Sequence, residues 1–518
     1  MSELNDTLPI GINETISQLN SSILDSNVTS YLNQTKEFVN QFSRNLAFTV
    51  YDSKLNNHIE PIYISYFTIV SLACLLIYIA SFATLEKPTN ALPPNPNHPL
   101  FDQTDKDTTY IKDAAIDEPH ALMMPLFAGV GLVGLYFGLQ KFDKTKLSYY
   151  LNKYILVISL KSNTFTITYF LKSALRSICY KFGISSLRFN KRYTLTFSND
   201  TMIHSSGIEE NLSLPDYTEK EKIIKEELLL ESRNDIAKED QLFNYYFSAA
   251  DIYGWIFGLL STVAFAYLDG ADNWLLSNIL SASSVIACIP MGRLPSFKPA
   301  FIILVFFFFY DIYFVFGSNV MMEVATKIDI PVKLLIPMRA NRELNEISMS
   351  MLGLGDLIIP GMAISLCLRY DLFKHHKEHP NTEYYHLQKF KKPYFTCALI
   401  SYAIGLITTI IVLHVYKHGQ PALLYLSPAL LISIVGMAIK KGDLKNLLKY
   451  NEDPHSDTKL EDKNAIDIDI ICSKETLFLA GAISAEDEDD KDDFDYVDES
   501  EIELMAEELE SEAEFDDE

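Results

Sequence analysis

Two aspartates interrupt apolar stretches of this chain and are its first candidates for chemistry. Asp311 lies within the apolar run 301–316, and Asp356 lies within the run 351–361. A carboxylate in hydrocarbon is costly, so an acid inside a membrane span is by default a candidate functional residue. The polar segment between the two runs indicates that they belong to successive spans.

The two carboxylates are expected to reach the same depth. If the first span ends near residue 319 and the next begins near residue 348, each aspartate is about eight residues, or roughly 12 Å, from the shared loop. Antiparallel helices would then bring both side chains to one level in the membrane.

A pair of carboxylates at one level suits two kinds of chemistry. Two acids a few ångströms apart share one proton, and aspartic proteases use this arrangement. The ionised acid takes a proton from water, the water attacks a peptide carbonyl, and the protonated acid stabilises the developing oxyanion. Acids in mid-membrane also serve as proton or cation sites, so a multi-pass transporter or channel is the alternative.

Small and helix-breaking residues accompany these acids. Gly353 and Gly355 allow a second backbone to approach Asp356, or the helix to begin late, and they leave room for an extended substrate. Tight helix packing is the alternative explanation for the two glycines. Pro421 lacks a backbone N–H and interrupts the helix ladder at the start of the last apolar run, although proline is commonplace in a first helical turn.

Membrane-spanning helices are the elements that must position these residues. Stretches of about 17 to 25 apolar residues can cross a bilayer as helices. The spans predicted in this way lie near 62–84, 121–139, 149–172, 246–268, 272–292, 298–319, 348–368, 394–415 and 421–439. The expected fold is therefore an all-α membrane protein with nine transmembrane helices.

Sequons and positive charges predict one orientation for these spans. Acceptor sites of the Asn-x-Ser/Thr type precede the first span at Asn5, Asn13, Asn20, Asn27 and Asn33. Such sites are used only in the lumen. The segments after the third, seventh and ninth spans are rich in Lys and Arg, which favours the cytosol. We therefore expect a lumenal N-terminus and a cytosolic C-terminus, with the sequon residues Asn199 and Asn211 cytosolic and unglycosylated.

Composition divides the chain into four segments. They are a lumenal glycosylated segment (1–60), three spans with a long cytosolic loop (61–245), six catalytic spans (246–443) and a cytosolic, acidic, disordered tail (444–518). From Glu486 to Glu518 the tail holds twenty acidic residues and one Lys, so it is expected to be disordered. No nucleic-acid partner is indicated, and the absence of CxxC spacing means that no metal site is predicted.

Three short motifs resemble those of a known family. Tyr310-Asp311, Gly353-Leu354-Gly355-Asp356 and Pro421-Ala422-Leu423 are similar to the YD, GxGD and PAL signatures of the presenilin-type intramembrane aspartyl proteases. The surrounding residues look most like the signal peptide peptidase family, strongly over 245–443 and loosely over 62–172. The motifs lie on the sixth, seventh and ninth predicted spans.

The resemblance implies an aspartic-type intramembrane endopeptidase without a cofactor. Asp311 and Asp356 would be catalytic, whereas Tyr310, Gly353, Leu354, Gly355, Pro421, Ala422 and Leu423 would shape the active site and bind substrate. The substrates would be transmembrane segments of type II orientation, such as signal peptide remnants, cleaved in the endoplasmic reticulum membrane. Membrane lipid, further copies of the chain in a homo-oligomer and membrane-protein quality-control partners are the other partners that the resemblance allows.

Overall fold

The computed structural model describes most of the helical part of the chain. It describes residues 33–51, 60–88, 118–141, 144–184, 189–198, 241–268, 273–318, 333–341, 346–416 and 419–452, with a few residues within 90–100 and residue 186. The acidic stretch 486–518 and the sequon residues Asn5, Asn13, Asn20 and Asn27 lie outside the described residues.

The chain forms two compact units. The first comprises Met1–Thr194 and Tyr246–Lys459, and the second comprises Leu195–Tyr245 and Leu460–Glu518. Within the second unit the structure describes only residues 195–198 and 241–245, which belong to strands. The candidate residues all belong to the first unit.

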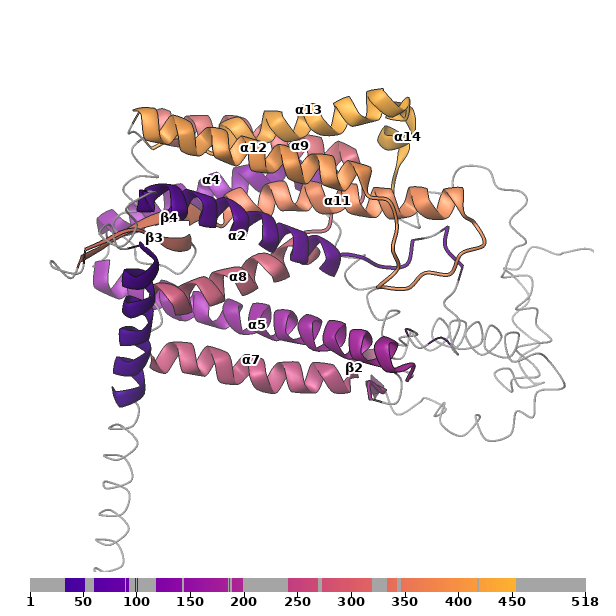
Figure 1. Cartoon of the computed structure of the whole chain (residues 1–518), viewed down its shortest axis with the longest axis horizontal. Coiled ribbons are helices and arrows are strands. Elements are labelled where there is room, and N and C mark those ends of the chain that lie inside the picture. The colour runs from indigo at the N-terminus through magenta and orange to yellow at the C-terminus, as the bar shows by residue number, and fades with distance from the viewer. Residues whose placement is uncertain are drawn as a thin grey trace, which may run out of the picture. The chain divides into compact units, whose positions relative to one another are not determined.

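Helices dominate the first unit (Figure 1). They are α2 (Pro61–Ala83), α4 (Glu118–Lys141), α5 (Lys144–Phe182), α7 (Ala249–Tyr267), α8 (Trp274–Met291), α9 (Phe297–Phe316), α11 (Gly355–Glu378), α12 (Pro393–Tyr416), α13 (Leu423–Lys441) and α14 (Leu444–Lys449). Residues 33–51 are also helical. Among the described helices, seven are long and apolar enough to cross a membrane, namely α2, α4, α7, α8, α9, α12 and α13.

Two further helices correspond to the third and seventh predicted spans. Helix α5 covers the whole of 149–172 and carries Lys153 and Lys161, while α11 covers most of 348–368 and carries Arg369 and Asp371 beyond it. Neither is among the seven helices that are long and apolar enough to cross a membrane. The number of nine spans therefore stays a prediction.

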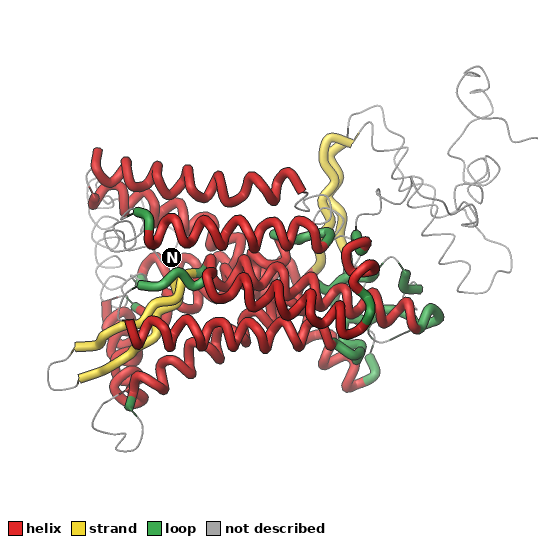
Figure 2. Tube along the Cα trace, turned by 90° about the horizontal axis from the view of Figure 1, so that it is seen from above, coloured by secondary structure: helices red, strands yellow, loops and turns green. Residues whose placement is uncertain are grey.

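The expectation of an all-α fold is wrong in one respect, because the described residues include strands (yellow in Figure 2). Strands β1 (Arg192–Ser198) and β2 (Gln241–Ser248) pair with each other, and β3 (Lys333–Asn341) pairs antiparallel with β4 (Glu346–Gly353). Strand β4 takes the first residues of the predicted seventh span, so α11 begins only at Gly355. Apolar Ile347, Met349 and Met351 alternate with polar residues in β4, which is the period of a strand.

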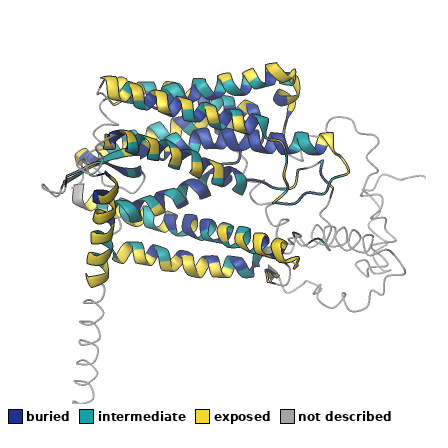
Figure 3. Cartoon of the chain, in the orientation of Figure 1, coloured by how far each residue is buried: buried dark blue, intermediate teal, exposed yellow. Residues whose placement is uncertain are grey.

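Helix α11 is the most deeply buried helix of the first unit (Figure 3). Apart from Ile358, every residue from Leu357 to Leu372 is buried. It packs against α2, α8, α9, α12 and α13. A helix that is covered on all sides must be largely apolar all round. Within the buried stretch 357–372, the only charged residues are Arg369 and Asp371. The helix that carries Asp356 is therefore surrounded by other helices of the first unit.

Candidate active site

Asp311 lies near the end of α9, on the buried face of that helix. Asp311 is 5% exposed. The other buried residues on this part of α9 are Ile303, Leu304, Phe307 and Phe314. These positions recur three or four residues apart, which places them on one side of a helix. The apolar pattern of α9 therefore turns the Asp311 carboxylate toward the interior.

Asp356 lies in the first turn of α11, directly after β4. Its predicted depth, about eight residues into a helix that starts near residue 348, is therefore wrong, because the chain before Gly355 is a strand. Helices α9 and α11 are nevertheless in contact, and the Asp311 and Asp356 carboxylates are close enough for the charge of one to act on the other. The two acids belong to one site.

Helix α13 begins at Leu423, and its first backbone amide reaches Asp311. The Leu423 N–H donates to Asp311 Oδ2 at 2.9 Å. The first N–H groups of a helix have no partner within the helix, and a helix N-terminus attracts negative charge. Pro421 and Ala422, both buried, lead into this turn. The Pro421–Leu423 segment thus contributes a backbone donor to the site.

The two glycines before Asp356 occupy different surroundings. A Cβ at Gly353 would lie 3.5 Å from Asp356 Oδ2, in ordinary contact, whereas a Cβ at Gly355 would meet no atom within 4 Å. Both glycines are exposed, and Leu354 between them is buried. The late start of α11 and the open space at Gly355 both agree with the first explanation, a late helix start with room beside Asp356. The open space does not agree with tight helix packing at Gly355.

Two tyrosines lie beside the acids. The Tyr310 ring packs against Phe307 and Phe314, with ring centroids 5.5 and 4.6 Å away. Sequence reasoning missed the second, Tyr402 of α12, which is completely buried and donates from its hydroxyl to the backbone carbonyl of Asp356 at 3.3 Å. A buried tyrosine hydroxyl needs a partner, so a tyrosine in an apolar span was the available signal.

Side chains of α8 hold the strand pair next to the site. Asn278 Nδ2 donates to the Leu335 carbonyl at 2.6 Å, and Asn278 Oδ1 accepts from the Leu335 N–H at 2.7 Å. Ser281 Oγ donates to the Lys333 carbonyl at 3.1 Å. These bonds satisfy backbone groups along one edge of β3, while its other edge pairs with β4. Strand β4, which leads into α11, is thereby fixed relative to the helices.

Comparisons with known proteins agree on one family. The signal peptide peptidase family model matches residues 106–454, which contain all three motifs. A "probable intramembrane protease" of Saccharomyces cerevisiae is 34% identical over 432 residues, covering 75% of this chain and 73% of that protein. The signal peptide peptidases of Mus musculus and Homo sapiens are each 30% identical, covering 66% and 64% of this chain and 77% and 73% of theirs.

Proposed function

Because the chain belongs to the signal peptide peptidase family of intramembrane proteases, we propose that Asp311 and Asp356 are its catalytic pair. The observation that carries the proposal is that two acids on the contacting helices α9 and α11 of a multi-pass membrane protein lie close enough for their charges to interact. Acids in such surroundings are rare and mark function. The reaction is the hydrolysis of a peptide bond within a transmembrane segment.

The two acids have complementary roles on one water molecule. The ionised carboxylate takes a proton from the water, whose oxygen attacks the peptide carbonyl carbon. The protonated acid donates a hydrogen bond to the carbonyl oxygen as negative charge develops there. The C–N bond then breaks, and the leaving nitrogen takes a proton from the acid pair. The Leu423 N–H keeps the Asp311 carboxylate oriented for these steps.

The substrate must be extended where it is cut, because a helix screens its carbonyl groups. Among the described strands, β4 pairs only with β3, and we propose that an extended substrate peptide adds to the other edge of β4. This strand ends at Gly353, three residues before Asp356. The open space at Gly355 gives the peptide backbone room beside the acid.

The sequons and the Lys/Arg-rich segments support a lumenal N-terminus and a cytosolic C-terminus in the endoplasmic reticulum membrane. Segments of type II orientation, such as signal peptide remnants, then enter the site with a cytosolic N-terminus. Asn33 lies exposed at the start of the helix 33–51, where a glycan is accessible.

Cleavage of a labelled type II signal-peptide substrate by the purified protein tests the proposal. Asp311→Ala and Asp356→Ala should each abolish cleavage in a protein that still folds. A transporter or channel would instead lose ion or solute flux in these variants and would cleave no peptide at any stage. Cleavage that persists in both single variants would overturn the assignment of the pair.

A further inference from the structure

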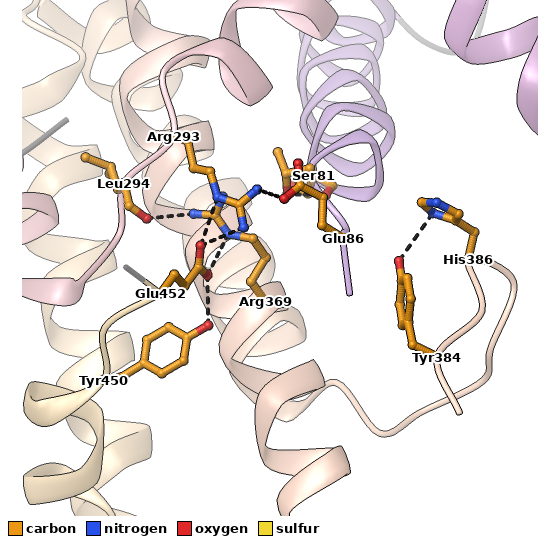
Figure 4. Close-up of polar contacts among 10 residues, drawn as sticks. Ser81, Glu86, Arg293, Leu294, Arg369, Tyr384, His386, Tyr450 and Glu452 are labelled. Atoms are coloured by element: carbon orange, nitrogen blue, oxygen red, sulfur yellow. Dashed lines mark hydrogen bonds and ion pairs between the residues drawn. The ribbon is translucent and has the colours of Figure 1, made fainter. Parts of the chain in front are cut away.

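A cluster of buried charges surrounds Glu452 (Figure 4). It includes Arg293, just before α9 begins, and therefore lies at the end of α9 away from Asp311. Arg293 Nη2 lies 2.8 Å from Glu452 Oε2, and Arg369 Nε lies 3.1 Å from Glu452 Oε1. Arg293 Nη1 also pairs with Glu86 Oε2 at 2.5 Å. The four side chains are between 4% and 12% exposed. Glu452 is therefore the shared anion of two buried guanidinium groups.

The backbone around Glu452 is tied to the start of α9. The Glu452 N–H donates to the Pro295 carbonyl at 3.0 Å, and Asn451 forms an antiparallel bridge with Ser296. The Tyr450 hydroxyl donates to Glu452 Oε1 at 2.8 Å. We call residues 450–452 the clasp. It pairs with the two residues that immediately precede α9, so the clasp fixes where that helix begins.

The clasp is tied to α11 through one side chain. Arg369, besides its ion pair with Glu452, donates from Nη2 to the Leu294 carbonyl at 2.8 Å. It follows Asp356 by thirteen residues, which is about 20 Å along the helix. Arg369 therefore links α11 to the same loop that the clasp holds.

Three helices with site residues converge on the clasp at their far ends. Helix α9 carries Asp311 and α11 carries Asp356, while α13, which precedes α14 and the clasp in the chain, begins with the Leu423 amide that binds Asp311. Packed helices transmit a displacement because they are rigid elements. A shift at the clasp therefore alters the relative heights of the groups at the other end.

We propose that Glu452 is a positioning residue for catalysis, which sets the height of Asp311 relative to Asp356 by joining the far ends of α9 and α11. The inference rests on the proposed function for its kinetic consequence. A buried ion pair holds its two elements together, because breaking it leaves an uncompensated buried charge. A displacement of about 1 Å at a catalytic group can cost 10²-fold in rate. Glu452 itself touches neither acid.

Hydrogen exchange separates positioning from a merely local anchor. The amide of Leu423 bonds Asp311, and the amide of Leu357 bonds the Leu354 carbonyl in the first turn of α11. In the full chain, Glu452→Gln should speed exchange of both amides at least fivefold. If Glu452 is only a local anchor, Glu452→Gln should speed amide exchange only in residues 294–296 and 450–452. Glu378 is an exposed carboxylate at the C-terminal end of α11. Glu378→Gln is therefore the matched control and should change exchange in neither region.

Kinetics supply the second readout. Glu452→Gln should lower kcat at least tenfold and leave KM within about twofold, because the groups that touch substrate remain. If Glu452→Gln does not fold, Glu452→Asp keeps the charge on a side chain one methylene shorter and should show the same changes, at least twofold. Parental exchange at Leu423 and Leu357 in the folded variant overturns the positioning role.

The two proposals fail in different ways. Exchange does not depend on cleavage, so a parent chain that cleaves nothing but responds to Glu452→Gln would refute the protease assignment and leave the mechanical link between the clasp and the site. A parent chain that cleaves substrate, with parental kcat in a folded Glu452→Gln, would leave the protease and refute the positioning role.

Discussion

The backbone N–H of Leu423 donates to Asp311 Oδ2 at 2.9 Å, between residues 112 positions apart in the chain. This bond joins the start of α13 to the acid of α9. Through this bond the Pro421–Leu423 segment presents to a carboxylate a helix amide that has no partner within its own helix. The side chains of the segment are buried and serve to place that amide.

The substitution Asp311→Asn distinguishes the role of the negative charge of Asp311 from the role of its hydrogen bond with Leu423. An amide oxygen still accepts from the Leu423 N–H, so Asp311→Asn should lose cleavage and keep slow exchange of that amide. Asp311→Ala also removes the acceptor, and the unpaired donor should lower the free energy of unfolding by about 1–3 kcal/mol relative to Asn. Hydrogen exchange and denaturant unfolding measure the two effects. Equal exchange in the Asn and Ala variants would show that the bond is not formed.

Gly355 tests whether the space beside Asp356 receives substrate. A Cβ at this exposed glycine would meet no atom within 4 Å, so Gly355→Ala and Gly355→Val should leave the unfolding temperature unchanged. They should lower kcat/KM, by about tenfold or more for Val, because the added methyl groups fill the space that the peptide needs. Gly361→Ala is the contrasting variant, since its Cβ would collide with Ile289, and it should destabilise the fold by about 1–3 kcal/mol. Parental kcat/KM for Gly355→Val would exclude this space from substrate binding.

Glu452 should make the stability of the fold depend on pH in acid. Burial raises the pKa of Glu452, but Arg369 and Arg293 outweigh burial, so this pKa lies below its ordinary value of 4.5. Such a carboxylate stabilises the fold above the unfolded pKa, and its contribution is lost as the pH falls through the folded pKa. The unfolding temperature should therefore drop below pH 4.5, and less steeply for Glu452→Gln. If the unfolding temperature fell equally with pH in the parent and in Glu452→Gln, the ion pairs of Glu452 with the two arginines would not contribute to stability.

Glycosylation tests the proposed orientation. If the N-terminus is lumenal, glycosidase treatment of the microsomal protein should increase its mobility on a gel. Replacement of Asn5, Asn13, Asn20, Asn27 and Asn33 by Gln should abolish that change. Asn199→Gln and Asn211→Gln are matched controls that should leave the mobility unchanged, because their segment is proposed to be cytosolic. A mobility change that depends on Asn199 or Asn211 would reverse the orientation.

Helix positions could be predicted from the sequence, because an apolar run inside a membrane must form its backbone hydrogen bonds within itself and therefore becomes a helix. The spans near 62–84, 298–319 and 394–415 correspond closely to α2, α9 and α12. The start of α11 was predicted wrongly. Residues 346–351 alternate between polar and apolar side chains, as a strand does, but they run directly into the apolar stretch 351–361. The strand is completed by pairing with β3, a contact between segments that the local sequence does not specify.

The candidate acids were visible in the sequence because charge in an apolar run is unusual. Their partners were less visible. Leu423 acts through a backbone amide, which no side-chain pattern reveals, and Tyr402 is one of many tyrosines in the chain. The ion pairs of Glu452 join segments that are far apart in sequence. Glu452 was assigned to the disordered tail 444–518, which is wrong for residues 444–452, because they form α14 and the clasp. Such contacts depend on the packing of the whole first unit.

Mass spectrometry of the products from a type II signal-peptide substrate tests the central claim most directly. The purified parent chain and the control Glu378→Gln should each give two fragments, whose masses sum to the substrate plus one water, with the break inside the apolar segment. Asp356→Asn should give no fragments at an unchanged unfolding temperature. Fragments from a folded Asp356→Asn protein would contradict the account.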